Sequence, residues 1–461
     1  MPPLAAQRAR PVRRHLAVAA ALGTVAAAAC HTDVNDPGIV SPTALQSATA
    51  LPTVIAGATG DFAVAYAGNN YTGDEGVILL GGLRADEWRN SDLFSTRLDV
   101  DRGTITTTNA SVGAVYRNLN TARRSAETAI TTFVSAAPTD YRRGLALSFD
   151  AYTYVLLAEN FCSGIPFTEL QSNGASFAYG QPLTTQQVFQ IAAARFDTAV
   201  TIAEQAAADQ SLGASVQSSA QEVAYLARVG RARALVGLNQ YAAAAASVAP
   251  VPPDFVFNIE YSANTQRENN GVYAFNAVNA RWSVADHEGV NGLPFVSAQD
   301  PRVPVDSAGT GVDNVTPLLL YATYSNYASP IPLATGTEAR LIAAEAALKL
   351  GAASQALDTL NVLRSGAGLP VLTLQSGSTA QAQQLMAERA FWLFATGHRL
   401  GDMRRLIRSP SLGGYGFAFT SVFPVGPYPK GGAPYGTDAN LPIPIDELNN
   451  PNFKQCIDRT T

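Results

Sequence analysis

Apolar residues that recur at spacings of three and four constrain this chain more than any other feature of its sequence. In the ranges 112–133, 145–159 and 188–203, this spacing places apolar side chains on one face of a helix. Hydrophobic residues make up 47% of the chain and charged residues 15%, which favours a substantial core over disorder. The sequence therefore predicts an all-α fold.

A weak internal repeat indicates how some of these helices pair. The spacing of alanines and leucine in 232–244 recurs in 344–356, with the turn residues Asn239 and Gly351 at matching positions. Small residues let two helices approach closely, and a short turn folds them antiparallel, as in tetratricopeptide-like hairpins. Because alanine-rich helices also match one another by chance, two units leave that alternative open.

Two segments depart from the helical period. Residues 250–336 and 409–451 are rich in Gly, Pro and aromatic residues, and they read as long ordered loops with short strands. Between them, residues 380–408 read as one long helix or a kinked pair, with Gly397 as the interruption.

The N-terminus carries an export signal. Four arginines precede an uninterrupted run of small and apolar residues, Leu16 to Ala29, and Cys30 follows directly. The run is too short to span a bilayer, so 1–29 reads as a signal peptide and Cys30 as the lipidated residue of a lipoprotein. The alternative is ordinary cleavage after Ala29. Residues 30–41 are polar and read as a flexible tether.

The chain beyond the leader is long enough for one large domain or two ordinary ones, and we predict a single domain over 42–461. Lipidation of Cys30 leaves Cys162 and Cys456 as an even pair in an oxidising compartment, which predicts a disulfide. Two buried free thiols are the alternative. The net charge of -5 and the absence of a basic cluster in the mature sequence disfavour nucleic acid as a partner.

The sequence offers no convincing catalytic set. Of four histidines, only His287 and His398 fall in the predicted domain, and no metalloprotease, serine hydrolase or phosphate-loop motif occurs. The triplet 286–288 (Asp-His-Glu) offers possible metal ligands, but adjacent residues point in different directions, so a solvated loop is the preferred interpretation. The sequence predicts neither a metal nor a cofactor.

Aromatic residues in polar, irregular segments are the candidate ligand-binding residues. Trp88 with Asn90 is the first choice, and Trp282 with Tyr273 and Tyr324 is the second. A flat ring covers the apolar face of a sugar while neighbouring polar groups bind its hydroxyls. The alternative is that each ring only anchors its own loop.

Two C-terminal motifs resemble those of the SusD/RagB family. Residues 388–405, ERAFWLFATGHRLGDMRR, are similar to the family pattern E-R-x-x-E-L-x-x-E-G-H-R-x-x-D-L-R-R. Residues 441–451, LPIPIDELNNP, resemble its closing L-P-I-P-x-x-E-L-x-x-N-P, and residues 341–369 fit the family too. Trp392 and Thr396 replace acidic residues of the pattern, which leaves local packing open.

The resemblance implies a tetratricopeptide-like helical lipoprotein on the cell surface, anchored in the outer membrane. Such proteins bind oligosaccharides or peptides, deliver them to a SusC-type TonB-dependent transporter, and are not enzymes. His398, Asp402 and Arg404 of the motif read most simply as structural charges that bridge a helix and neighbouring loops.

Two other functions remain open. A helical adaptor lipoprotein that binds only protein would have Trp88 and Trp282 buried. An exported hydrolase would bring two carboxylates together in a cleft.

Overall fold

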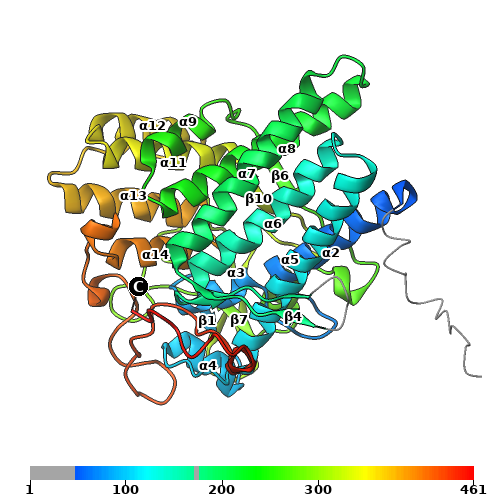
Figure 1. The fold of residues 1–461 in the computed structure, drawn as a ribbon. Coiled ribbons are helices and arrows are strands. Elements are labelled where there is room, and N and C mark those ends of the chain that lie inside the picture. Colours follow the sequence, from blue (N-terminus) through cyan, green and yellow to red (C-terminus); the bar gives the residue numbers. More distant parts are fainter. Residues whose placement is uncertain (1–46, 171–175, 461) are drawn as a thin grey trace, which may run out of the picture. The chain divides into compact units, whose positions relative to one another are not determined.

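The computed structural model describes residues 47–170 and 176–460 of the chain. Helices make up most of these residues, and short antiparallel strand pairs lie in the connections between them (Figure 1). The predicted leader, Cys30 and tether (1–41) lie outside the described residues. Those boundaries, and the extent of the single domain, therefore stay predictions.

Long helices lie side by side in chain order and form the scaffold (Figure 1). They are α2 (Leu51–Ala67), α5 (Ala110–Ala136), α6 (Tyr141–Asn160), α7 (Thr185–Ala208) and α8 (Ala214–Gly237). The central helix is α6, which contacts each of the other four. Every side chain from Ala146 to Asn160 is buried, so the polar groups of α6 need partners inside the protein.

Side-chain caps begin these helices where the sequence changes from loop to helical period. Asn109 and Asp140 accept amide hydrogen bonds at the starts of α5 and α6. Thr184 and Gln187 form a reciprocal capping box at the start of α7. The three predicted amphipathic helices are thus confirmed.

The two predicted hairpins are also confirmed. In the first, α8 folds back onto α9 (Tyr241–Val248), and in the second α11 (Gly336–Lys349) folds back onto α12 (Ala353–Gly366). The turn residues Asn239 and Gly351 both have positive φ, 62° and 85°. Since α11 also packs against α8 and α9, the hairpins stack as tetratricopeptide-like units do.

The last part of the helical scaffold is a kinked pair. Helix α13 (Ser378–Trp392) ends before a tight turn in which Ala395 and Gly397 have φ of 57° and 73°, and α14 (Arg399–Ile407) follows. Of the two alternatives predicted for 380–408, the kinked pair of helices is therefore correct. The turn between the helices has positive φ at Ala395 as well as at the predicted Gly397.

The loop-rich segments contain short strands, as predicted for 250–336. The strand pairs are β1 (Trp88–Asn90) with β7 (Trp282–Val284), β2 (Ile165–Pro166) with β5 (Pro182–Leu183), β3 (Glu169–Leu170) with β4 (Phe177–Ala178), β6 (Val256–Ile259) with β10 (Ile331–Thr335), and β8 (Val305–Thr310) with β9 (Pro317–Tyr321). Short helices α3 (Val77–Arg84), α4 (Ser95–Arg102) and α10 (Gly271–Tyr273), and a π-helical turn (Ala274–Val278), complete the connections.

By length and mean hydropathy alone, the segment Ala48–Ala67 could cross a membrane. This is weak evidence for a span, because one face of α2 packs into the core. Phe62 and Tyr66 are fully buried, and the Phe62 ring lies 5.0 Å from that of Phe149 in α6.

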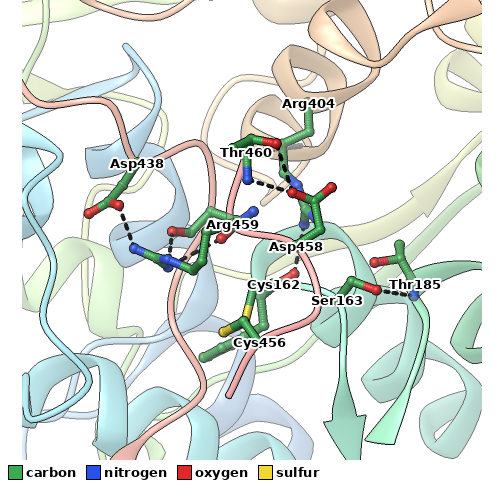
Figure 2. The surroundings of a disulfide bond; sticks show 11 residues. Cys162, Ser163, Thr185, Arg404, Asp438, Cys456, Asp458, Arg459 and Thr460 are labelled. Atoms are coloured by element: carbon green, nitrogen blue, oxygen red, sulfur yellow. Dashed lines mark hydrogen bonds and ion pairs between the residues drawn. A yellow bond between two sulfur atoms is a disulfide. The ribbon is translucent and has the colours of Figure 1, made fainter.

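The predicted disulfide between Cys162 and Cys456 is present (Figure 2). It joins the end of α6 to the C-terminal tail across 294 residues, with the two Cα atoms 5.9 Å apart. The tail is also hydrogen-bonded there, because the Cys162 amide donates to Leu441 O (2.9 Å) and the Ile457 amide to Ser163 O (2.7 Å). The closing segment is therefore part of the fold.

We expect removal of this disulfide to lower the free energy of unfolding substantially. Closing a loop of this length restricts the unfolded chain and, in the chain-entropy model, contributes about 4 to 5 kcal/mol at most. The comparison is urea unfolding of the wild type against the Cys162→Ser/Cys456→Ser double variant, and thiol titration of the denatured, unreduced wild type checks the bond directly. Two titratable thiols, or equal stability of the two proteins, would contradict the assignment.

Candidate functional site

Four loops from distant parts of the sequence form one surface, which we call the loop face. It comprises residues 69–74, 91–94, 278–281 and 311–316. Ser91 Oγ donates to Ala280 O (2.9 Å), the Val312 amide donates to the same carbonyl (3.1 Å), and Asn279 Nδ2 donates to Asn70 Oδ1 (3.3 Å). Hydrogen bonds thus join the four loops to one another.

The predicted ligand residues Trp88, Asn90 and Trp282 lie beneath this surface and are fully buried. They belong to the β1–β7 pair, in which Asn90 is opposite Trp282. The Trp88 ring packs 5.4 Å from that of Phe394. The prediction that these side chains are available to a ligand is therefore wrong for this conformation, and the two tryptophans anchor the loops instead.

The prediction failed because the polar residues around Trp88 are themselves buried and paired. Asp86 binds the Arg399 guanidinium through two hydrogen bonds (2.6 and 2.8 Å). Glu87 accepts the Ala395 amide (3.3 Å). Burial raises the pKa of Glu87 to about 8, although the nearby positive charge of Arg399 lowers it. A polar stretch can therefore be core when its partners lie elsewhere in the chain.

The two predicted tyrosines differ from each other. Tyr324 is buried, and its hydroxyl donates to Ala395 O (3.2 Å), so its prediction as a ligand contact is also wrong for this conformation. Tyr273 is half-buried and packs edge-on against Tyr327, with ring centroids 5.3 Å apart. Its part in ligand binding stays a prediction.

The loop face exposes a different set of apolar side chains. Phe94 is 55% exposed and lies two residues beyond the buried Asp92. The others are Tyr71, Leu93, Val278, Val312 and Val315. Sequence analysis missed these residues, although one signal was available. Leu93 and Phe94 are two adjacent apolar residues directly before α4, and the first buried residue of that helix is the polar Arg97.

Cations surround the exposed ring. The guanidinium groups of Arg97 and Arg281 lie 5.0 and 5.2 Å from the Phe94 ring centroid. Both pair with Asp92, and Lys430 donates to the Asp92 carbonyl (3.0 Å). Burial alone would raise the pKa of Asp92, but the hydrogen bond from Arg281 and the charge of Arg97 lower it. The result is a half-exposed aromatic ring with fixed guanidinium groups over it.

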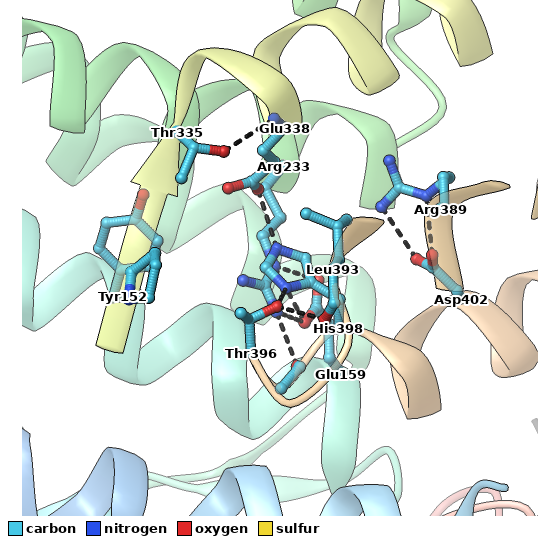
Figure 3. Close-up of polar contacts among 12 residues, drawn as sticks. Tyr152, Glu159, Arg233, Thr335, Glu338, Arg389, Leu393, Thr396, His398 and Asp402 are labelled. Carbon is cyan, nitrogen blue, oxygen red and sulfur yellow. Dashed lines mark hydrogen bonds and ion pairs between the residues drawn. The ribbon is translucent and has the colours of Figure 1, made fainter. Parts of the chain in front are cut away.

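Charged residues of the 388–405 segment form a buried network, part of which Figure 3 shows. Asp402 pairs with Arg389 (2.7 Å) and Arg405 (2.9 Å), and Arg405 also reaches Glu345 (2.9 Å). Burial would raise the pKa of Asp402, but the two arginines lower it well below its ordinary value. This network ties α14 to α13 and α11.

His398 and Arg404 make further bridges. His398 Nε2 lies 3.0 Å from Glu338 Oε1, and its Nδ1 lies 2.9 Å from Thr396 Oγ1 (Figure 3). Arg404 donates to main-chain carbonyls at the end of α6, described further below. The predicted structural role of His398, Asp402 and Arg404 is therefore confirmed.

Both the sequence of the C-terminal part and the fold are similar to known proteins. Residues 322–456 match the model of the SusD family. The fold matches a SusD-like carbohydrate-binding protein from Bacteroides fragilis NCTC 9343 (TM-score 0.63, 14% identity, 89% of this chain and 99% of that one). It also matches SusD superfamily proteins from Parabacteroides distasonis ATCC 8503 (0.63, 15%, 88% and 98%) and Bacteroides thetaiotaomicron VPI-5482 (0.62, 14%, 88% and 100%).

The match over residues 322–456, together with the fold, confirms the resemblance to the SusD/RagB family. No curated protein sequence matches it. At the identities above, the likeness to the solved structures is one of fold, and the mostly helical, tetratricopeptide-like architecture is shared.

Two acidic side chains converge, but they are buried rather than open to a cleft. Asp101 and Glu288 are both buried, where Tyr428 donates to Asp101 (2.8 Å), and Tyr435 and Arg89 bind Glu288. Burial, with the nearby charge of Glu288, raises the pKa of Asp101. The pair is enclosed by protein, unlike the open carboxylates that a hydrolase requires.

The side chains of the triplet 286–288 diverge as expected, but the prediction of a solvated loop is wrong for Glu288, which is fully buried. Asp286 Oδ1 accepts the amides of Val296 and Ser297 (3.0 Å each), whereas Glu288 points inward to Arg89. Within 47–170 and 176–460, no group of three or more His, Cys, Asp or Glu is placed to hold a metal ion.

We expect Glu87→Gln to remove part of the pH dependence of folding. The folded pKa of about 8 exceeds the ordinary value of 4.5, so between these values the folded protein holds a proton that the unfolded chain releases. Wild-type stability therefore falls as pH rises through this window. Gln resembles the protonated acid, so the variant should gain stability relative to wild type by at most about 1.4 kcal/mol per pH unit.

Urea unfolding at pH 5 and pH 8.5 measures this difference. Glu222→Gln, which removes a carboxylate from the exposed surface of α8, is the matched control. Parallel pH profiles for Glu87→Gln and wild type would show that Glu87 is ionised in the folded protein.

Proposed function

We propose that this chain is a cell-surface lipoprotein, anchored in the outer membrane through Cys30, that captures oligosaccharides or peptides. It delivers them to a SusC-type TonB-dependent transporter and catalyses no reaction itself. The observation that carries the proposal is the family match over 322–456, which includes both C-terminal motifs. One structure of matching fold is described as a SusD-like carbohydrate-binding protein, which supports a glycan as the ligand.

The loop face supports the binding role physically. The exposed ring of Phe94 offers a flat apolar surface, and Arg97, Arg281 and Asp92 fix donors and acceptors beside it. Sugar rings combine an apolar face with hydroxyl groups at the edge, so they match this pairing of an aromatic ring with planar polar groups. We therefore assign the ligand site to Phe94 and its neighbours, in place of Trp88 and Trp282 beneath them.

A second candidate function is a helical adaptor lipoprotein that binds only protein. One observation favours it: Trp88 and Trp282 are buried, as that function predicts. The exposed apolar residues of the loop face would then contact a protein partner. Glycan binding at Phe94 distinguishes the two functions.

We expect Phe94→Ala to weaken glycan binding by roughly 5- to 150-fold, which corresponds to about 1–3 kcal/mol of lost apolar contact. Because Phe94 is exposed, the melting temperature should change little. Calorimetry with a panel of neutral and acidic oligosaccharides measures the affinity. Trp88→Ala should instead destabilise the fold by about 3–5 kcal/mol.

Val362→Ala, at an exposed position of α12, controls for the loss of any surface apolar group. If the panel binds and Phe94→Ala binds as the wild type does, the site lies elsewhere. If no glycan binds while protein partners do, the adaptor function replaces this one.

We also expect tagged protein to recover a large TonB-dependent barrel protein from an outer-membrane extract in mild detergent. Cys30→Ser should lose labelling by a palmitate analogue but, when added to the extract, still bind the transporter. The two measurements thus separate anchoring in the membrane from binding to the transporter. Recovery of no barrel protein by either form would count against delivery to a transporter.

A further inference from the structure

A pocket of about 570 Å³ lies along one face of α5, outside the loop face. The helix supplies Gly113, Arg117 and Arg124 at helical spacing, and Pro166, Phe177 and Pro444 form apolar walls from neighbouring segments. Its volume falls in the range that small-molecule and sugar sites occupy.

The pocket combines an exposed aromatic ring with available positive charge. Phe177 and Arg117 are both exposed, and among residues 47–170 and 176–460 no carboxylate lies within ion-pair distance of Arg117. The guanidinium of Arg124 lies 3.4 Å from the Glu127 carboxylate, whereas the guanidinium of the buried Arg123 lies 2.7 Å from the same carboxylate. Arg117 and Arg124 can therefore bind an anion without breaking a short ion pair within the protein.

Acidic groups also line the pocket, but one of them is shielded. Asp446 is exposed at the rim. Burial raises the pKa of Glu447, which lies against the Tyr116 hydroxyl. These groups can accept hydrogen bonds from hydroxyls, while the arginines supply donors for a carboxylate or sulfate.

A second, smaller hollow lies between the pocket and the loop face and shares one lining residue with the pocket. That hollow, about 210 Å³, is lined by Tyr71 of the loop face and by Thr121 of α5, and Thr121 also lines the larger pocket. Ser125 of the larger pocket donates to Asp61, which lines the smaller one. The residues of α5 that line the larger pocket, Gly113 to Ser125, span about 18 Å of helix, and the smaller hollow borders this stretch at Thr121.

We propose that the α5 pocket is a second subsite, which takes an acidic sugar unit of an oligosaccharide whose other units lie on the loop face. The proposal rests on the glycan-binding function proposed above. Arg117 and Arg124 bind the carboxylate or sulfate, and Phe177 covers the face of the sugar ring.

Gly113 gives a direct way to fill the pocket. A Cβ added there meets no atom within 4 Å, and a leucine also favours the helix over glycine, so Gly113→Leu should fold. Gly57 in α2 is likewise open and lies outside the pocket, so Gly57→Leu is the matched control. Arg117→Gln tests the charge with little change in shape.

The probes are an oligogalacturonide trimer and octamer, each also in methyl-esterified form, and heparin-derived fragments of the same two lengths. For the wild type, the acidic octamer should bind on the order of 10-fold more tightly than the trimer, because it reaches both sites. Gly113→Leu should remove this gain and leave trimer affinity unchanged, while Gly57→Leu keeps it. Arg117→Gln should weaken octamer binding about 3- to 10-fold at low salt and less at high salt.

Three results would overturn the proposal. A length gain in Gly113→Leu equal to that of the wild type would exclude the subsite and leave the function proposed above standing. An equal gain for the methyl-esterified octamer would exclude its acidic specificity. If no acidic or neutral probe binds the wild type, both proposals are wrong.

Discussion

The rest of this structure depends on which groups donate hydrogen bonds to the free carbonyls at the carboxyl end of α6. The last carbonyls of a helix have no partner within it, and α6 is buried where water cannot supply one. The Arg404 guanidinium, itself buried, donates to the carbonyls of Ala158 (2.9 Å), Glu159 (2.7 Å) and Phe161 (3.0 Å). Arg233 pairs with the Glu159 side chain and donates to Gly397 O (3.0 Å). One helix end therefore fixes the positions of α8, α14 and the turn before α14.

The features that the sequence predicts well are those set by neighbours along the chain. The helical period of α5, α6 and α7 is local, and so is the positive φ that makes Gly351 a turn residue. The Cys162–Cys456 pairing is not local, but only two cysteines remained once Cys30 was assigned to lipid, so counting was enough.

The candidate site was harder because burial there depends on partners that lie far apart in the sequence. Asp86 lies 313 residues from Arg399, and Arg89 lies 199 residues from Glu288. Without those partners, the polar stretch around Trp88 looks solvated, and the tryptophan looks available to a ligand. Sequence analysis thus pointed to a segment next to the loop face, but the side chains it chose are buried, and the exposed ring there is that of Phe94. Which aromatic residue faces solvent is decided by tertiary ion pairs rather than by local composition.

The disulfide has a topological consequence for the folded chain. Cys162 and Cys456 close a covalent ring that contains the helical hairpins and two of the four loop-face segments, 278–281 and 311–316. A single backbone cut by a protease anywhere between Ser163 and Gln455 opens this ring but leaves both pieces bonded. Nicked molecules would separate only under reducing conditions, so exposed loops within the ring, such as 311–316, can be cleaved once without release of either fragment.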